Sequence, residues 1–458
     1  MKKGKNANQS LLATTKPSKA IVDLAIPATL ALLAKAVYNI VDTAYIGMLH
    51  DDIALAAVGV TVPLLLIMVS IENIFAAGAA VLAGRQLGSH DDDAASRTVT
   101  TIIGVLLCVL GILFLEPVMR AFGASDLSIG QAKDYAFWMF IAALANLPAQ
   151  SMNCAARAES SVKISSIAVI TGTALNILLD PIFMFDWGLG MKVEGASLAT
   201  TVSQFVTFFI MAGFYLSGKS VIKLRGKSFR PSWQLIKSVT LIGIPTAVIQ
   251  ICLALAASLT NMAAKPMADS DQIIAAYGVV QRLILIDSYI IMGFMQGYQP
   301  VAAYAFGACN ESRFRESARF AFRGSLVLAL MVDALYVLLS RVLISLFNQN
   351  PVIIDYGAKL LISQVALFPA FGLCYMMTIT FQTIGDSRYG LFLSFIRQGL
   401  FYVPFILILP RLMGILGIYL SQPAADVLTL IVCICSVKKM NATALAKMGP
   451  LPSDHTQA

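Results

Sequence analysis

The chain has 458 residues, of which 58% are hydrophobic and only 13% are charged, and its formal net charge is +8. Soluble domains are about 45–50% apolar and about 25% charged, so this composition excludes an ordinary soluble domain. The apolar runs stay unbroken for about twenty residues, which predicts membrane-spanning helices, whereas the strands of a transmembrane barrel would alternate polar and apolar residues over about ten positions.

Twelve helices are predicted in chain order from the apolar runs between charged stretches. They lie near residues 20–48, 53–82, 98–119, 134–156, 163–186, 194–217, 236–264, 272–300, 318–340, 353–382, 389–411 and 414–437. Polar segments divide the chain into an N-terminal tail, a six-helix bundle, a basic linker, a second six-helix bundle and a C-terminal tail, at 1–19, 20–217, 218–237, 238–437 and 438–458. The expected fold class is an all-α polytopic membrane protein.

Lysine and arginine are concentrated on one side of this twelve-span arrangement. The N-terminal tail carries five and the linker carries six, whereas the opposite loops are rich in acidic residues. Because basic residues favour cytoplasmic loops, both termini are predicted to be cytoplasmic in a multi-pass plasma (inner) membrane protein. The net charge of +8 therefore needs no nucleic-acid partner.

The two halves are related in sequence. "IPATLALLAKAVYNIVDTAYIG" from residue 26 matches "IPTAVIQICLALAASLTNMAAK" from residue 244 in hydropathy and in the leading Ile-Pro. Six spans in each half give both halves the same orientation, so the bundles are predicted to be pseudo-symmetric about an axis along the membrane normal. Parallel repeats of this kind build transporters whose site lies where the repeats meet.

The first predicted helix carries polar residues that an apolar span does not need. Lys35, Asn39 and Asp42 are spaced i, i+4, i+7 and therefore share one face. A charged side chain at mid-bilayer costs roughly 2.5–3.5 kcal/mol on insertion scales, so such residues are candidates for ion or proton coupling. The structural alternative is that Lys35 and Asp42 neutralise each other or hold helices together.

The fifth predicted helix repeats the pattern in "NILLDP". Asn176 and Asp180 are four residues apart, and Pro181 cannot donate to the carbonyl of Ile177. A carboxylate, an amide and a spare carbonyl are oxygen ligands suited to a hard cation or to a proton-bearing cluster. All three histidines lie in loops or in the tail, so carboxylates would have to carry any proton that crosses.

Other polar or adaptable side chains within the spans are candidate substrate contacts. They are Tyr38, Met68, Glu72, Asn146, Asn153, Asp287 and Gln296. Asp333 and Asp426 are expected to reach an interface with water rather than to act inside the protein. For Arg282 and Arg397, pairing with acids and reaching an interface both remain open.

Three patterns are set aside. "GFYLSGKS" at 213–220 fits a phosphate-binding loop, but it ends an apolar helix rather than following a buried strand, so direct drive by ATP is not expected. The seven scattered cysteines predict neither a disulfide nor a zinc site. No metal-ligand spacing, nucleophile–base pair or repeated pore signature favours a membrane enzyme or a channel.

Several separated motifs resemble one known family. "YNIVDTAYIG", "NILLDPIFMF", "GASLATTVSQ", "GYQPVAAYAFGA" and "QTIGDSR" occur in the order found in the multidrug and toxic compound extrusion (MATE) family, over residues 20–437. The chain looks most similar to the MepA-like bacterial branch. The resemblance implies two six-helix bundles in a V with alternating access, and export of organic cations in exchange for protons or sodium.

The resemblance also implies which residues bind the coupling ion. Carried over motif by motif, they are Asp42, Asn176, Asp180 and a hydroxyl of either Thr200 or Thr201, which the sequence does not separate. Asp42, Asn176 and Asp180 are equally the ligands of the sodium alternative. Some members carry further acids on helices seven and ten, which this chain lacks apart from a terminal acid, so coupling is predicted to depend on the N-terminal cluster, with protons favoured.

We therefore expect a monomeric secondary active multidrug efflux transporter that exports organic cations by proton antiport, with no cofactor and no enzymatic activity. Lys35 is unusual, since an ammonium group near Asp42 would either stabilise its ionised form or replace the cation in an empty site. The rival hypothesis is a flippase for a lipid or a lipid-linked oligosaccharide, which basic residues such as Lys35, Arg282 and Arg397 would favour.

Overall fold

The computed structural model describes residues 11–48, 52–113, 129–224 and 232–448, except for the side chains of 43, 46, 47, 52–68, 193 and most of 103–140. All the secondary-structure elements assigned in these ranges are helices. The helices that precede the linker are α2 (Pro17–Met48), α3 (Asp52–Gly88), α4 (Asp92–Leu113), α6 (Ile129–Ala158), α7 (Val162–Met184) and α8 (Lys192–Leu216).

The helices after the linker form the second half of the chain. They are α9 (Trp233–Ala264), α10 (Ser270–Gly307), α11 (Glu311–Ser345), α12 (Pro351–Val365), α13 (Pro369–Thr383), α14 (Ser387–Phe395), the π-helix η2 (Ile396–Tyr402), α15 (Val403–Met413) and α16 (Ile415–Met448). α9 begins and α16 ends outside the predicted bundle limits, so part of the expected linker and part of the expected C-terminal tail are helical.

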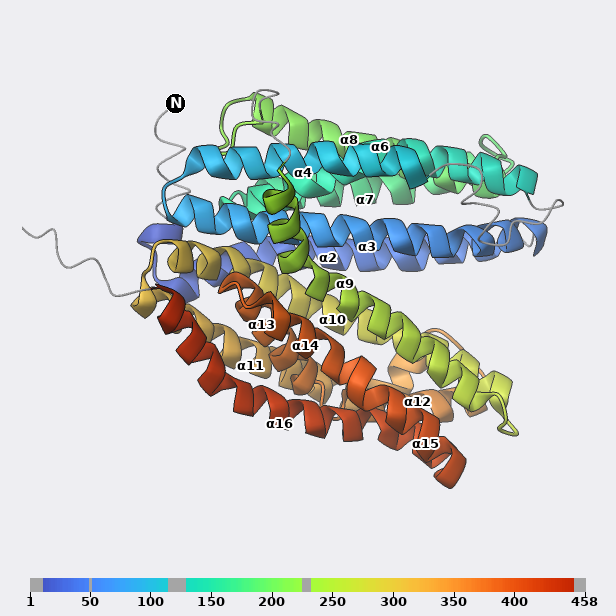
Figure 1. Cartoon of the computed structure of the whole chain (residues 1–458). Coiled ribbons are helices and arrows are strands. Elements are labelled where there is room, and N and C mark those ends of the chain that lie inside the picture. The colour runs from blue at the N-terminus through green and yellow to red at the C-terminus, as the bar shows by residue number, and fades with distance from the viewer. Residues whose placement is uncertain (1–10, 49–51, 114–128, 225–231, 449–458) are drawn as a thin grey trace, which may run out of the picture.

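The two halves form two bundles arranged as a V. Figure 1 shows α2 to α8 in one arm and α9 to α16 in the other, close together at the end near the chain's N-terminus and spread apart at the opposite end. Among the described residues, eight helices are long and apolar enough to cross a membrane, or nine if the bent pair α12–α13 counts as one span. The predicted all-helical membrane fold class is confirmed.

Close helix contacts join the two arms of the V. α2 packs against α10, and α3 packs against α9. A Cβ atom added at Gly243 of α9 would overlap the backbone carbonyl of Ile74, and one added at Gly293 of α10 would overlap Thr29. Small residues let membrane helices approach closely, so these glycines fix the line along which the bundles meet.

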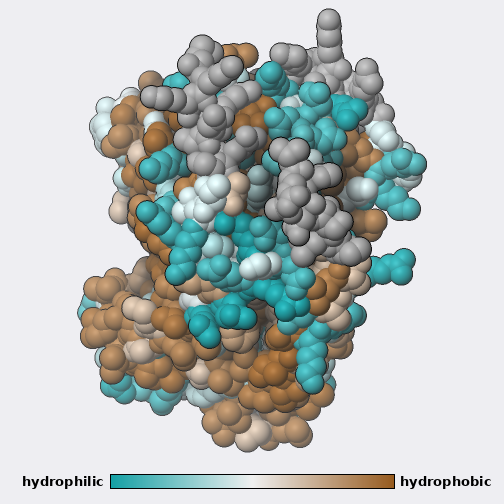
Figure 2. Space-filling model, turned by 90° about the vertical axis from the view of Figure 1, so that its left-hand side faces the viewer, coloured by the Kyte–Doolittle hydropathy of each residue, from teal (hydrophilic) through white to brown (hydrophobic). Residues whose placement is uncertain are grey.

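The converging end of the molecule is polar and is held by a hydrogen bond between the bundles. Arg85 of α3 donates to the carbonyl of Gln382 of α13, and its guanidinium lies 5.7 Å from the ring centroid of Phe306. Figure 2 shows hydrophilic residues across this end, with hydrophobic residues on the flanks of the C-terminal bundle. This distribution is typical of a water-facing end between lipid-facing sides.

The C-terminal bundle contains two interruptions of regular helix at neighbouring positions. α12 and α13 meet at an angle of 44° across a break of a few residues. Asn350 caps the start of α12 by accepting a hydrogen bond from the amide of Val352, with Pro351 at the first turn. The π-helix η2 lies between α14 and α15, and such wide turns are rare and often found at functional sites.

Candidate functional site

The predicted ion-coupling residues lie near one another in the N-terminal bundle, where α7 packs against both α2 and α8. On α2, Lys35, Asn39 and Asp42 follow one face of the helix. Asp42 is partly buried, and it lies close enough to Asp180 of α7 for the two negative charges to repel each other. The chain therefore brings two carboxylates together from helices that are far apart in sequence.

Hydrogen bonds extend this cluster to α8. The amide Nδ2 of Asn176 donates to Oδ1 of Asp180 at 3.3 Å and to Oγ1 of Thr200 at 3.4 Å. Thr201 points elsewhere, because its hydroxyl donates to the backbone carbonyls of Ser197 at 2.8 Å and Trp138 at 2.9 Å. Of the two threonines that the sequence left open, Thr200 is the one that faces the cluster.

Two oxygen atoms of the cluster are buried without a hydrogen-bond partner in the described part of the chain. They are Oδ2 of Asp180 and Oδ1 of Asn176, and these side chains are 0% and 3% exposed. A buried acceptor without a partner is costly, so each oxygen is suited to a proton, a water molecule or a cation. Pro181 leaves the carbonyl of Ile177 without its usual helical donor, which adds a third oxygen nearby.

A polar cavity of about 80 Å³ opens beside this cluster. Its lining is Lys35, Tyr38, Asn146, Gln150, Asn153, Val169, Gly172, Thr173, Asn176, Thr200, Ser203, Gln204 and Thr207. The cavity has room for a few water molecules, whereas pockets that enclose drug-sized molecules are about 300–1,000 Å³. It is therefore an ion or water site, and a large substrate would need space outside it.

Glu72 belongs to the edge of this cavity. Oε2 of Glu72 accepts a hydrogen bond from Nδ2 of Asn146 at 3.1 Å, and the carboxylate lies close enough to Lys35 for their charges to attract. Asn153 is 1% exposed, and its Oδ1 has no partner in the described ranges. Lys35 is exposed and faces the same cavity, so its ammonium group is partly balanced by the Glu72 carboxylate.

The remaining candidate substrate residues do not share this location. Met68 lies in α3, but its side chain is outside the described residues. Asp287 and Gln296 lie on α10 in the other bundle, where Asp287 is 0% exposed. The structure thus places Asp287 and Gln296 in the C-terminal bundle and Tyr38 and Asn146 in the N-terminal one, and the assignment of all four as substrate contacts stays a prediction.

Several lining residues were missed by the sequence analysis. Ser203, Gln204 and Thr207 follow Thr200 on α8 at intervals of three and four residues, so all four lie on one face. The polar stripe is visible in "TTVSQFVT", but hydroxyl residues are ordinary in membrane helices and gave no charge signal. Helical spacing measured from Thr200 would have identified them.

The prediction that Asp426 reaches an interface with water is wrong, because its side chain is 0% exposed inside the C-terminal bundle. Asp333 is also mostly buried, and 8% of it remains exposed. Arg397 of η2 pairs with Asp426, with Nε to Oδ1 at 2.8 Å, so this arginine is buried in an ion pair. Arg282 is exposed, as the interfacial alternative expects. Burial was not visible from the sequence, because both acids lie in apolar runs without a recognisable motif.

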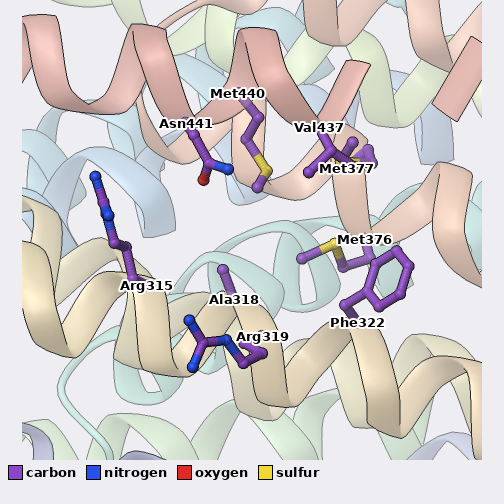
Figure 3. Close-up of a pocket in the computed structure, with 9 residues that line it drawn as sticks. All are labelled: Arg315, Ala318, Arg319, Phe322, Met376, Met377, Val437, Met440 and Asn441. Atoms are coloured by element: carbon purple, nitrogen blue, oxygen red, sulfur yellow. The ribbon is translucent and has the colours of Figure 1, made fainter. Parts of the chain in front are cut away.

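A larger pocket of about 310 Å³ lies in the C-terminal bundle, away from the N-terminal cluster. Figure 3 shows its lining from α11, α13 and α16: Arg315, Ala318, Arg319, Phe322, Met376, Met377, Val437, Met440 and Asn441. Arg315 is paired with Glu311 at 2.7 Å. With two arginines and no acid among its lining residues, this pocket suits an organic cation poorly despite its size.

The fold and the polar cavity define a class of protein. Two bundles of membrane-length helices with carboxylates buried inside one of them are typical of secondary transporters. The MatE family model matches residues 27–182 and 245–408, which is more than half of the chain. The chain belongs to the MatE family, and the resemblance seen in its motifs is confirmed.

Known proteins agree with this assignment. The multidrug export protein MepA of Staphylococcus aureus (strain NCTC 8325 / PS 47) is 24% identical over 415 residues, which cover 89% of this chain and 90% of MepA. An outward-facing multidrug resistance MATE family transporter superimposes with a TM-score of 0.87 at 23% identity, over 95% of this chain and 98% of that one. A transporter of Pyrococcus furiosus, whose binding pocket is described as reversed in polarity, superimposes with a TM-score of 0.83 at 23% identity. The match covers 95% of this chain and 98% of that one.

Proposed function

We propose that this protein exports organic cations across the plasma membrane in exchange for protons that enter the cell. The observation that carries the proposal is the buried cluster of Asp42, Asn176, Asp180 and Thr200 beside a polar cavity. Two carboxylates that repel each other favour uptake of a proton, and ionised they favour a cation. The charge of this cluster thus links the two partners of an antiport: the proton binds inside the cluster, and the organic cation is attracted to the space outside the small cavity only while the cluster is ionised.

The direction of transport follows from the distribution of charge. Among the described residues, Arg85 and Lys447 lie at the converging end of the V, where they donate to the carbonyls of Gln382 and Gly385, and basic residues favour the cytoplasmic side. With this end cytoplasmic, the arms spread toward the outside, and the arrangement corresponds to an outward-open state of an alternating-access cycle. Protons then reach the cluster from the outer side, down the membrane potential.

The proposed cycle uses the chain's own residues at each step. With Asp42 and Asp180 ionised, an organic cation from the cytoplasm is attracted toward the N-terminal bundle. A proton arriving from outside neutralises the pair and weakens the hold on the cation, which leaves. Each elementary charge that moves down the potential supplies about 2.3 kcal/mol per 100 mV. Pro27, inside α2, is a site at which that helix can bend as the charge of Asp42 changes.

The comparisons support the substrate class. The relatives of comparable length are multidrug export proteins, and they align over about nine-tenths of both chains. Protons are preferred to sodium because the neutral donors around Asp180 leave an oxygen of this carboxyl group without a partner, which a proton would satisfy. Sodium remains the alternative ion at the same three residues.

The flippase hypothesis is less well supported, because the basic residues that favoured it are dispersed. Lys35 lies near Glu72, Arg397 is bonded to Asp426, and Arg282 is exposed. A pocket for an anionic lipid headgroup would need such cations gathered in one place. The cavity of this chain instead combines a lysine with neutral amides, hydroxyls and nearby acids.

The test is dye efflux from proteoliposomes containing the purified protein, first under an imposed pH gradient and then under a sodium gradient. We expect the pH gradient to drive efflux of an ethidium-like cation, and Asp42→Asn to abolish that response. Asp23→Asn is the matched control, since Asp23 lies on the same helix but is exposed. Normal efflux by the Asp42 variant, or efflux driven by sodium alone, would refute proton coupling at this site.

A further inference from the structure

A second group of buried ionisable residues lies in the C-terminal bundle. Asp287 is on α10, Asp333 on α11, Arg397 on η2 and Asp426 on α16. Their exposed fractions are 0%, 8%, 6% and 0%. Three carboxyl groups therefore lie inside the described part of this bundle together with the guanidinium of Arg397, whereas the buried Arg313 lies at the start of α11, against Leu11. If all were ionised, this interior would carry two uncompensated negative charges.

The guanidinium of Arg397 is already committed to one of these acids. Its Nε lies 2.8 Å from Oδ1 of Asp426 and its Nη2 lies 3.2 Å from Oδ2, which is the bidentate arrangement. Gln422 also donates to Oδ1 of Asp426 at 2.9 Å. Asp426 is thus held as a carboxylate with its charge balanced and its oxygens bonded.

Asp287 and Asp333 lack such partners. Both side-chain oxygens of Asp287 and Oδ1 of Asp333 are buried without a hydrogen bond in the described part of the chain. α10 and α11 pack together, and the charges of the two acids are close enough to repel. An unpaired carboxylate in such surroundings is unfavourable, and binding a proton removes its charge.

In the described part of the surrounding helices, no group of charge opposite to Asp287 lies near it except Arg397. Tyr336 of α11 is close to it, but the Tyr336 hydroxyl donates to the carbonyl of Leu283 at 2.8 Å. On α12, Lys359 pairs with Asp355 in an exposed position. Lys35 of α2, which packs against α10, lines the cavity of the N-terminal bundle instead. α13 contains no charged residue. The charged groups that act on Asp287 are therefore Asp333 and, at longer range, Arg397.

We propose that Asp287 and Asp333 form a second proton-binding site, in which Asp287 holds the proton and Asp333 exchanges it with water. Asp333 is the more exposed of the two, so it is the one through which a proton enters. The site is distinct from the N-terminal cluster and does not depend on which compound is transported.

Arg397 connects this site to the irregular part of the bundle. Its guanidinium lies 5.8 Å from the ring of Phe368, which is in the break between α12 and α13, and 5.3 Å from the ring of Phe371, in the first turn of α13. Broken helices of transporters are the segments that line their binding sites. A change of angle at this break would therefore move Arg397 relative to Asp287 and Asp333, and so change how firmly the proton is held.

The test is infrared spectroscopy of the purified full-length protein in detergent at neutral pH, which detects the C=O stretch of protonated carboxyl groups. We expect Asp287→Asn to remove the absorbance of one such group, and Asp333→Asn to slow its hydrogen–deuterium exchange several-fold. Asp355→Asn is the control, because that exposed acid is paired with Lys359 and should leave both measurements unchanged.

Two results would overturn this proposal. One is a spectrum of the Asp287 variant that is identical to that of the unaltered protein, which would mean that Asp287 is ionised. The other is unchanged exchange in the Asp333 variant, which would remove its role in proton entry. Because neither measurement involves transport, failure of the dye-efflux experiment would leave this outcome unaffected, and the reverse also holds.

Discussion

A buried aspartate of each bundle, Asp180 in the first and Asp426 in the second, is held in opposite ways. In the N-terminal bundle, Asp180 is bonded to the neutral amide of Asn176 beside a cavity of about 80 Å³. In the C-terminal bundle, Asp426 is bonded to Arg397, and the pocket next to that arginine is only about 20 Å³, enough for a single water. Water access and the charge of the partner, rather than the acid itself, decide whether a buried carboxylate can change its ionisation.

The largest effect is expected from breaking the buried ion pair of the C-terminal bundle. Arg397→Ala leaves Asp426 as an unpaired buried charge, which typically costs about 3–5 kcal/mol. The free energy of unfolding in mixed detergent micelles measures this loss. Arg341→Ala is the control, because its pair with Asp355 is 75% and 42% exposed and should contribute less than about 1 kcal/mol.

A double variant sharpens this test. Arg397→Met with Asp426→Leu replaces the pair by apolar side chains of similar length, which is often neutral or stabilising. We expect most of the lost stability to return. If Arg397→Ala is as stable as the Arg341→Ala control, the ion pair of Arg397 with Asp426 does not stabilise the bundle. Asp426 would then not differ from Asp180 in how its charge is balanced.

A smaller effect is expected from a buried acid at the converging end of the N-terminal bundle. Glu159 follows α6 and is 3% exposed, and its Oε2 accepts hydrogen bonds from Ser220 Oγ at 2.8 Å and from the amides of Val221 at 2.9 Å and Ile222 at 3.2 Å. Its Oε1 is buried with no partner in the described ranges. Burial is the largest influence and raises the pKa of Glu159 from 4.5 to about 7, against the lowering effect of these hydrogen bonds.

The sign of the resulting pH dependence is fixed by proton binding. Between pH 4.5 and about 7 the folded protein binds more protons at Glu159 than the unfolded chain does, so stability falls as pH rises through this window. The slope is at most about 1.4 kcal/mol per pH unit. Unfolding measured at several pH values should show this fall, and Glu159→Gln should flatten it. A rise of stability with pH over the same window, lost in the variant, would mean that the hydrogen bonds outweigh burial.

The sequence predicted the fold, and it singled out Asp42 and Asp180, for a physical reason. Long apolar runs predict the spans, because the bilayer imposes their length. Asp42 and Asp180 stand out because a carboxylate inside such an apolar run is energetically costly, which makes it a candidate functional residue. The pairing of the two acids required the family resemblance, since nothing in local spacing relates α2 to α7.

The C-terminal bundle was harder to predict because its important features depend on packing between distant helices. Asp333 and Asp426 occur in apolar runs just as Asp42 does, yet only the folded bundle shows that one has a guanidinium partner and the other does not. The π-helix that holds Arg397 and the break beside Phe368 leave no clear sequence signal. The sequence left Thr200 and Thr201 as alternatives for the same reason, since adjacent residues differ only in the helix face they occupy.

The smallest effect on stability is expected from this pair of threonines, and it separates a site hydroxyl from a structural one. Thr201→Val removes a hydroxyl that bonds two backbone carbonyls, which should cost about 1 kcal/mol of unfolding free energy and leave proton-driven efflux intact. Thr200→Val removes only a 3.4 Å acceptor of the Asn176 amide, so stability should change by less than about 0.5 kcal/mol.

The effect of Thr200→Val on transport should nevertheless exceed that of Thr201→Val. Without this hydroxyl, the Asn176 amide is free to bond Asp180 alone, which favours the ionised carboxyl group and shifts the pH of half-maximal efflux downward. The measurement is proton-driven efflux by both variants from about pH 5.5 to about 8.5, a range roughly centred on neutrality, which compares their pH of half-maximal efflux. If the shift occurs in Thr201→Val instead, Thr201 rather than Thr200 faces the cluster during transport. The hydrogen bond between Asn176 and Thr200 would then belong to a different state of the transporter.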